Sequence, residues 1–256
     1  MIHSSAVIDP SALLDQGVEV GPFAVIGAGV EIGAGTRIGP HTVIRGLTRI
    51  GRDNRIFQFA SIGEDPQDMK YGGEETRLEI GDRNQIREYV TLHRGTVQDQ
   101  GVTRIGSDNL FMAYTHVAHD CRIGNHVIMA NGASLAGHVE IQDWVILGGF
   151  VLVHQFCRIG AHSFSAMGSA LAKDVPPYVM VSGHPATPRG INSEGLRRRG
   201  YSPEVIAAIK RAYRTLYMAD LRLDQARERL RELVAEVPEV APLADFVADR
   251  GRGLLR

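Results

Sequence analysis

Hydrophobic residues recur at every sixth position over the first two thirds of this 256-residue chain. The run contains Ile8, Leu14, Val20, Ile26, Ile32, Ile38, Ile44, Ile50, Ile56, Ile62, Ile80, Ile86 and Leu92. After a one-residue slip in phase it resumes as Ile105, Phe111, Val117, Ile123, Met129, Leu135, Ile141, Leu147, Val153, Ile159, Ser165 and Leu171, of which only Ser165 is polar. A helix repeats every 3.6 residues and a strand every two, so neither explains a period of six. A short strand and a turn, repeated every six residues and stacked as a parallel β-helix, do explain it.

Two further positions of the repeat agree with this prediction. A glycine often follows the aliphatic residue directly, as at Gly27, Gly33 and Gly51. We expect these glycines to adopt the positive φ of a turn, which β-branched residues resist. Four residues after the aliphatic position the side chain is small, as at Ala24 and Cys121.

The pattern resembles that of the hexapeptide-repeat family, whose fold is a left-handed parallel β-helix with three hexads in each coil. The left hand is implied by the resemblance alone, because ordinary parallel crossovers are right-handed. With three hexads per coil, residues 18 apart stack roughly 4.8 Å from each other. Cys121 and Cys157 then lie two coils apart, about 9–10 Å, beyond the roughly 7 Å reach of a disulfide. We expect both thiols to be buried and unreactive.

Two segments interrupt the repeat, at residues 64–79 and 93–104. Ile62 and Ile80 are still 18 residues apart, so we expect the first segment to be a loop that replaces part of a coil. The second segment shifts the phase by one residue. Loops that leave a rigid scaffold often carry function, although tolerated surface insertions remain the alternative.

The repeat ends near Leu171, and residues 174–190 are rich in proline and read as a linker. We expect the β-helix to cover residues 1–189 and a helical domain to cover residues 190–256, which contain only 5 of the 29 glycines. Ser202 and Pro203 form a helix start, with serine as the cap and proline in the first turn. Two further helices are expected over about 223–236 and 240–250.

Composition limits the function. The chain has 28 basic and 29 acidic side chains, which argues against a general nucleic-acid binder. No apolar run approaches the ~18 residues of a membrane span, and no secretory signal is visible at the start. Only two cysteines are present, which fits a reduced, cytoplasmic protein. The helical part carries 13 basic and 10 acidic side chains, so it could suit an acidic partner.

Four of the ten histidines fall near one edge of the expected β-helix: His116, His119, His138 and His154. Asp120 lies one coil below His138. Two chemistries fit such a cluster. The first is a zinc site, since histidine is a common zinc ligand. The second is a general base, because a carboxylate that orients an imidazole makes it a better proton acceptor near neutral pH.

A closer resemblance covers nearly the whole chain. The most specific stretches are IGSDNLFMAYTHVAHDC, LAGHV, VHQFCRIGAH, IGEDPQDMKYGGEE, LHRGTVQ and INSEGLRRRG. Together they resemble the UDP-N-acetylglucosamine O-acyltransferases that begin lipid A synthesis. Such enzymes transfer an R-3-hydroxyacyl group from acyl carrier protein to the glucosamine 3-hydroxyl of UDP-N-acetylglucosamine. The resemblance implies a homotrimer with sites between neighbouring β-helices, and no cofactor or metal.

The resemblance also implies roles for individual residues. His119 matches the general base, Asp120 its orienting partner, and the Gly137 N–H the oxyanion donor. The residues that match groups around the sugar and the acyl chain are Asp68, Lys70, His116, His138, His154 and Gln155. Those that match nucleotide and diphosphate contacts are Asn192, Glu194, Arg198 and Arg199. A basic helix start remains the alternative for the two arginines.

Met167 departs from the commonest pattern, because relatives that use 3-hydroxymyristoyl groups have glycine at the matching position. A methionine there is expected to shorten the acyl pocket, so a donor nearer 3-hydroxydecanoyl is predicted. The alternative is that Met167 merely fills the core.

Three rival functions stay open. The related N-acyltransferase of the same pathway has an extra N-terminal domain, whereas this repeat begins at about residue 7. A metal-dependent lyase similar to the hexapeptide carbonic anhydrases would use the histidines as ligands. A non-catalytic β-helix would leave the histidine edge unexplained.

Overall fold

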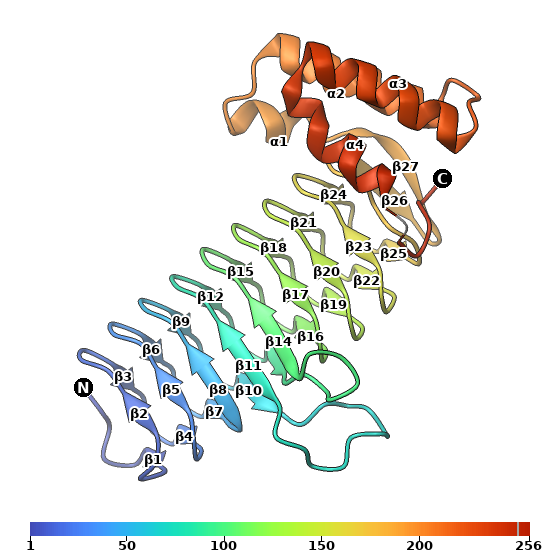
Figure 1. The fold of residues 1–256 in the computed structure, drawn as a ribbon. Coiled ribbons are helices and arrows are strands. Elements are labelled where there is room, and N and C mark those ends of the chain that lie inside the picture. Colours follow the sequence, from blue (N-terminus) through green and yellow to red (C-terminus); the bar gives the residue numbers. More distant parts are fainter. Residues whose placement is uncertain (250) are drawn as a thin grey trace.

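The six-residue period of the sequence becomes three parallel sheets that form the walls of a left-handed β-helix (Figure 1). The computed structural model describes residues 1–249 and 251–256. Each sheet is named here after its first strand. The β1 sheet contains β1 (Val7–Ile8), β4 (Val25–Ile26), β7 (Val43–Ile44), β10 (Ser61–Glu64), β13 (Thr91–His93), β16 (His116–Val117), β19 (Ser134–Leu135), β22 (Leu152–Val153) and β25 (Ala170–Leu171).

The other two walls have the same construction. The β2 sheet contains β2 (Leu13–Leu14), β5 (Glu31–Ile32), β8 (Leu47–Ile50), β11 (Arg77–Ile80), β14 (Val102–Ile105), β17 (Arg122–Ile123), β20 (Glu140–Ile141) and β23 (Arg158–Ile159). The β3 sheet contains β3 (Glu19–Val20), β6 (Arg37–Ile38), β9 (Arg55–Ile56), β12 (Gln85–Ile86), β15 (Leu110–Phe111), β18 (Ile128–Met129), β21 (Ile146–Leu147), β24 (Phe164–Ser165), β26 (Val179–Gly183) and β27 (Ala186–Ile191).

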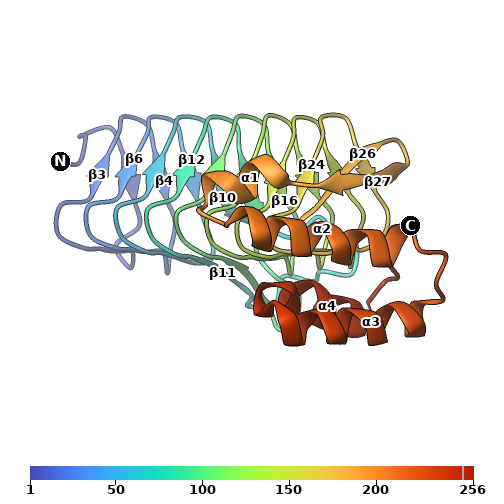
Figure 2. The same ribbon diagram turned by 90° about the horizontal axis from the view of Figure 1, so that it is seen from above.

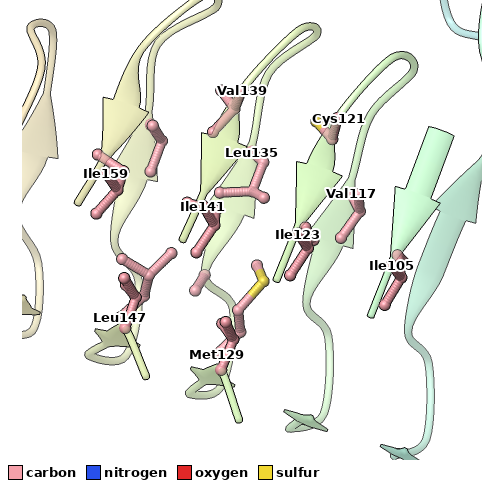
Figure 3. Close-up of a cluster of buried hydrophobic side chains, with 14 of the residues drawn as sticks. Ile105, Val117, Cys121, Ile123, Met129, Leu135, Val139, Ile141, Leu147 and Ile159 are labelled. Atoms are coloured by element: carbon pink, nitrogen blue, oxygen red, sulfur yellow. The ribbon is translucent and has the colours of Figure 1, made fainter. Parts of the chain in front are cut away.

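The core is a narrow column of the sixth-position side chains (Figure 3). Val117 pairs with Leu135, and Leu135 pairs with Val153, so the expected 18-residue stacking is confirmed. All three side chains are buried. Cys121 and Cys157 are also buried and free, as the repeat predicted. Burial raises the pKa of the Cys121 thiol to about 12 and that of Cys157 to about 11, which leaves both poor nucleophiles.

The expected role of the glycines was wrong. Gly33 has no positive φ, and a Cβ built on it would lie 2.7 Å from the carbonyl carbon of Gly51 in the next coil. These glycines are therefore required for the close approach of successive backbones. The positive φ occurs at the third residue after the aliphatic position, for example at Phe23 and His41. That residue is frequently aromatic or polar, and its ring stacks on the equivalent ring of the next coil, as Phe23 does on His41.

Both interruptions are loops inserted where the chain passes from a strand of the β1 sheet to the next strand of the β2 sheet. The first spans residues 65–76, between β10 and β11, and the second spans 94–101, between β13 and β14. The expectation that the first loop replaces part of a coil was wrong. Ile62 pairs with Leu92, and Ile80 pairs with Ile50, so no wall is lost and the coil simply lengthens. Figure 1 shows both loops leaving the same edge of the β-helix.

The C-terminal part closes the end of the β-helix. Residues 174–190 were expected as a linker, but β26 and β27 form an antiparallel hairpin that continues the β3 sheet. The valines of β26 alternate inward, which provides the strand pattern despite the neighbouring prolines. The hairpin is followed by α1 (Ser193–Arg198), α2 (Pro203–Tyr217), α3 (Leu223–Glu236), the 3₁₀ turn η1 (Pro238–Val240) and α4 (Ala241–Ala248). The domain boundary at residue 189 falls inside β27 and stays a prediction.

The helices gather beside the last coils (Figure 2). Ser202 caps α2 by accepting a hydrogen bond from the Val205 N–H, as expected from the sequence. The buried face of α2 includes Ile209, Tyr213 and Leu216, which join the core. No helix among the described residues is long and apolar enough to cross a membrane.

Candidate functional site

The histidine edge is the corner at which the chain leaves the β1 sheet for the β2 sheet. His119 and Asp120 follow β16, and Gly137 and His138 follow β19 one coil further on. The His138 N–H donates to the His119 carbonyl at 3.0 Å, which fixes the two turns against each other. The imidazole rings of His119 and His138 pack edge to face, with centroids 5.1 Å apart. The fold therefore brings together on successive coils two side chains that are 19 residues apart in the sequence.

His119 and Asp120 form a hydrogen-bonded pair. Nδ1 of His119 lies 2.8 Å from Oδ2 of Asp120. The Asp120 side chain is almost fully buried, whereas His119 keeps 13% of its side chain exposed. Because Nδ1 faces the carboxylate, Nε2 is the ring nitrogen left for a substrate. This is the arrangement of an oriented general base.

The second loop holds Asp120 in place, and sequence reasoning missed this contact. The backbone N–H of Thr96 donates to Oδ1 of Asp120 at 2.8 Å, and the Thr96 hydroxyl donates to Oδ2 at 2.7 Å. Burial alone would raise the pKa of Asp120, but the hydrogen bonds from His119 and Thr96 outweigh it and lower that pKa below its usual value. Asp120 is therefore a buried anion at neutral pH.

Gly137 lies directly against the imidazole of His119. A Cβ built on Gly137 would approach Cε1 of His119 to 2.5 Å and Nε2 to 2.7 Å, so only glycine fits there. Among the described residues, no carbonyl or side chain accepts a hydrogen bond from the Gly137 N–H. An open backbone donor thus lies next to the ring nitrogen that faces substrate.

A hollow between the first loop and this corner is lined by Asp68, Lys70, His119, His138 and Gln155. A second hollow contains His116 and Gly137, and it shares His119 and Gln155 with the first. The two hollows therefore meet at His119. Asp68 and Lys70 share a turn, since the Lys70 N–H donates to Oδ1 of Asp68 at 3.0 Å.

His116 is a neutral member of this group. Its Nδ1 lies 2.7 Å from the Thr91 hydroxyl, and its ring packs edge to face on that of buried His93. Burial, with smaller contributions from His93 and His119, lowers the pKa of His116 to about 4. A neutral imidazole can offer one hydrogen bond to an uncharged part of a substrate.

His138 is held by the second loop as well. Its Nδ1 lies 3.1 Å from Oδ2 of Asp99, a loop residue that sequence reasoning did not select. Asp99 also accepts a hydrogen bond from Arg122 at 3.4 Å. Thr96 and Asp99 both fall within the phase break of the repeat, so the six-residue count gave no signal for either.

Six expected site residues lie away from these hollows in one copy of the chain: His154, Met167, Asn192, Glu194, Arg198 and Arg199. His154 is exposed, and its Nδ1 forms a hydrogen bond only with the neighbouring Gln155 carbonyl among the described residues. Met167 is 80% exposed, so the alternative that it fills the core is wrong.

The four nucleotide candidates lie at a different corner, where the chain passes from the β2 sheet to the β3 sheet. Asn192 caps α1, accepting from the Gly195 N–H, and its amide donates to the His162 carbonyl. The Arg199 guanidinium lies 5.1 Å above the Trp144 ring and donates to the Trp144 carbonyl at 3.2 Å. Burial lowers the pKa of Arg199, and its Nη1 has no partner among the described residues.

Arg198 has the opposite character to Arg199. Its side chain is 77% exposed, and it is ion-paired with Glu194 at 2.9 Å. Glu194 is also paired with Arg197. Exposed pairs of this kind contribute little to stability, about 0–1 kcal/mol, so a ligand could replace them at low cost.

The metal alternative can be compared with this geometry. His119, Asp120 and His138 each offer a ligand atom, and these atoms lie within 4.8 Å of one another. However, Asp120 already accepts three hydrogen bonds, two from Thr96 and one from His119. A carboxylate has about four acceptor positions. The hydrogen bonds that Asp120 accepts from Thr96 and His119 therefore suit a carboxylate that holds a general base better than one that binds a metal ion.

Comparisons with known proteins agree with the resemblance seen in the sequence. The profile of UDP-N-acetylglucosamine O-acyltransferase domain 2 matches residues 174–255, and that of the bacterial transferase hexapeptide matches residues 11–46 and 103–137. The chain is 62% identical over 255 residues to the acyl-(acyl carrier protein)–UDP-N-acetylglucosamine O-acyltransferase of Alkalilimnicola ehrlichii, covering 100% of this chain and 99% of that protein. The enzyme of the same name from Pseudomonas fluorescens is 58% identical over 256 residues, with the same coverage.

Solved structures give the same result. LpxA from Acinetobacter baumannii superposes with a TM-score of 0.98 at 51% identity, covering 100% of this chain and 99% of that one. The UDP-N-acetylglucosamine acyltransferase of Francisella novicida also gives a TM-score of 0.98, at 46% identity, covering 100% and 94%. The expected fold and family are thereby confirmed. This chain belongs to the UDP-N-acetylglucosamine O-acyltransferase family.

Proposed function

We propose that this chain transfers an R-3-hydroxyacyl group from acyl carrier protein to the glucosamine 3-hydroxyl of UDP-N-acetylglucosamine, the first step of lipid A biosynthesis. Family membership supports the reaction class. The observation that carries the mechanism is the pair formed by His119 and Asp120, with the open N–H of Gly137 against the same imidazole. A base and an oxyanion donor are the two groups that acyl transfer from a thioester needs.

In the proposed mechanism, Nε2 of His119 accepts the proton of the sugar 3-hydroxyl as its oxygen attacks the thioester carbonyl carbon. Asp120 accepts the Nδ1–H hydrogen bond and stabilises the imidazolium that forms. The N–H of Gly137 donates to the oxyanion of the tetrahedral intermediate. The intermediate collapses as the carbon–sulfur bond breaks, and the imidazolium returns its proton to the departing thiolate. No covalent enzyme intermediate or cofactor enters these steps.

The first loop is proposed to hold the sugar. Asp68 accepts hydrogen bonds from hydroxyl groups, and Lys70 supplies a positive charge above the same hollow. His138 and Gln155 also line that hollow, and His116 lines the neighbouring one. We assign His154, which follows β22 next to Gln155, to the acyl chain. The division of these residues between sugar and acyl group rests on the family resemblance.

We propose a homotrimer in which each site is shared between two copies. Asn192, Glu194, Arg198 and Arg199 lie at another corner of the triangular cross-section than His119, so one copy does not unite them with the base. A neighbouring copy can supply them. Arg199 suits this role because its guanidinium is held in place by Trp144, and its buried Nη1 has no hydrogen-bond partner among the described residues. An arginine fork matches the oxygens of a diphosphate.

Met167 is proposed to limit the acyl chain, which favours a donor nearer 3-hydroxydecanoyl than 3-hydroxymyristoyl. In one copy its side chain projects from the surface at the turn after β24. Such a side chain is available to close a pocket formed with a neighbouring copy.

The test is transfer from a series of R-3-hydroxyacyl carrier proteins to UDP-N-acetylglucosamine, read by mass spectrometry, with His119→Ala beside the wild type. We expect a medium-chain product that the variant does not form. Equal activity of the variant would remove His119 as the base. Absence of product with every donor would defeat the proposed function, and metal content of the purified protein would then test the lyase alternative.

A further inference from the structure

Thr96 is a buried threonine whose two polar groups are both directed at the carboxylate behind His119. The residue is 1% exposed, and it comes from the second loop, not from the repeat. Its N–H and hydroxyl donate to different oxygens of Asp120 at 2.8 and 2.7 Å. Two donors on one residue, engaging both oxygens, define the rotation of the carboxylate as well as its position.

The rotation matters because Asp120 has two imidazole neighbours. Oδ2 lies 2.8 Å from Nδ1 of His119 but also 3.8 Å from Nε2 of His138. A carboxylate without other restraints could turn from the first ring towards the second. The Thr96 hydroxyl donates to the same Oδ2 and holds it at the His119 side.

Thr96 is itself fixed by the backbone around it. Its carbonyl accepts hydrogen bonds from the N–H groups of Asp99 at 3.3 Å and Gly101 at 3.0 Å. The preceding N–H groups of Arg94 and Gly95 donate to the carbonyls of Glu64 and Arg77. After the threonine, the Gly101 carbonyl accepts a hydrogen bond from the Arg77 N–H at 2.8 Å. The loop is therefore tied to β10 and β11 before Thr96 and to β11 after it, and it can act as a rigid support for Asp120.

We propose that Thr96 is a positioning residue, which fixes the Asp120 carboxylate in the rotation that aligns His119 as the base. The inference rests on the proposed function, because it assigns Thr96 a role in the same site. Thr96 is proposed to touch no substrate and to act only through Asp120.

Thr96→Val tests the proposal, because valine keeps the shape and the backbone donor and removes only the hydroxyl. We expect kcat to fall about tenfold, as for loss of a hydrogen bond to a charged group, while KM for UDP-N-acetylglucosamine changes less than about twofold. Thr96→Ser should restore kcat to near the wild-type value. Thr42→Val is the matched control, since Thr42 is also buried and its hydroxyl donates to the Phe57 carbonyl at 3.0 Å, far from the site.

A double-mutant cycle separates positioning from a general structural effect. If Thr96 acts through Asp120, then Thr96→Val in an Asp120→Asn background should lower kcat less than about twofold further. An equal tenfold loss in both backgrounds, or a wild-type kcat for the single variant, would overturn the proposal. Thr96→Ala gives the same comparison if valine disturbs folding.

A crystal structure of Thr96→Val tests the inference without any reaction. We expect Oδ2 of Asp120 to move beyond hydrogen-bond distance of Nδ1 of His119. A carboxylate that stays 2.8 Å from that nitrogen would overturn the proposal. A wild-type protein that forms no acylated product would instead defeat the proposed function, and the structure would still decide the role of Thr96.

Discussion

Gly137 and His119 come from successive coils, and a Cβ on the glycine would lie 2.5 Å from Cε1 of the imidazole. The contact is a direct result of the repeat. Residues 18 apart stack on successive coils, so Gly137 lies above His119. In the same way, His138 lies above Asp120. Because Gly137 has no side chain, its backbone N–H and the imidazole of His119 can lie next to the same small space.

Gly137→Ala is therefore expected to displace the imidazole and the N–H donor together. Loss of one oxyanion donor typically costs about 10²–10³-fold in kcat, and we expect a loss of at least ~100-fold. Steady-state kinetics with UDP-N-acetylglucosamine provide the measurement. Gly149→Ala is the control, because the nearest atom to its added Cβ would be the Asn131 carbonyl oxygen at 3.4 Å. Comparable activity of the two variants would show that the glycine contact does not matter for catalysis.

Met167→Gly should lengthen the acyl chain that the protein prefers. Each methylene transferred out of water contributes about 0.8 kcal/mol, roughly fourfold in binding, so even two further methylenes would change donor selection by about fifteenfold. Competition between 3-hydroxydecanoyl and 3-hydroxymyristoyl carrier proteins measures the ratio of products. Met218→Gly is a suitable control, since Met218 is similarly exposed at the end of α2. An unchanged ratio in Met167→Gly would rule out the chain-length role.

The repeat made much of this fold predictable. A spacing of 18 was enough to place Val117, Leu135 and Val153 on one wall, because each hexad adds one short strand and one turn. The same spacing indicated that His119, Asp120, Gly137 and His138 share a corner. Periodicity does not report φ, however, which is why the glycines after the aliphatic positions were given the wrong role.

Irregular segments were the least predictable. Thr96 and Asp99 lie in a loop whose residues have no counterpart one coil away, so nothing in the sequence pattern placed them under Asp120 and His138. The hairpin of β26 and β27 lacks the six-residue period and follows prolines, and it read as a linker for that reason. In both cases tertiary contacts, not local preference, determine the structure.

Arg94 connects the two loops, and Arg94→Met should weaken sugar binding. Its guanidinium contacts Asp65 and donates to the Tyr71 hydroxyl at 3.0 Å, so it braces the loop that carries Asp68 and Lys70. We expect KM for UDP-N-acetylglucosamine to rise about tenfold, with a smaller change in kcat. Arg49→Met is the control, because Arg49 is exposed and paired with Glu31 away from both loops. A fall in kcat with an unchanged KM would contradict this role.

Complementation between inactive chains tests the shared site. His119→Ala and Arg199→Ala should each be nearly inactive alone. If a site combines His119 of one copy with Arg199 of another, each mixed trimer should contain one functional site out of three, about a third of the wild-type number. Co-expression with two different affinity tags, purification through both and an activity assay provide the measurement. Mixed oligomers without activity would show that each copy builds its site alone.

The low pKa of His116 predicts a pH-dependent stability. Folding lowers this pKa from an ordinary value near 6.5 to about 4, chiefly through burial. Between these two values the unfolded chain binds a proton that the folded chain rejects, so the free energy of unfolding falls as the pH drops from about 6.5 to 4. The contribution is fully present above pH ~6.5, and its loss amounts to on the order of 3 kcal/mol.

His116→Gln should remove this contribution, because glutamine does not titrate. Urea unfolding at several pH values and one fixed protein concentration measures the effect. We expect the stability of the variant to decline less than that of the wild type between pH 6.5 and 4, by on the order of 3 kcal/mol. His154→Gln, at an exposed position, should follow the wild-type curve. Identical pH dependence in His116→Gln and the wild type would mean that the folded protein accommodates a charged His116, which would weaken the case for a neutral imidazole beside the substrate hollow.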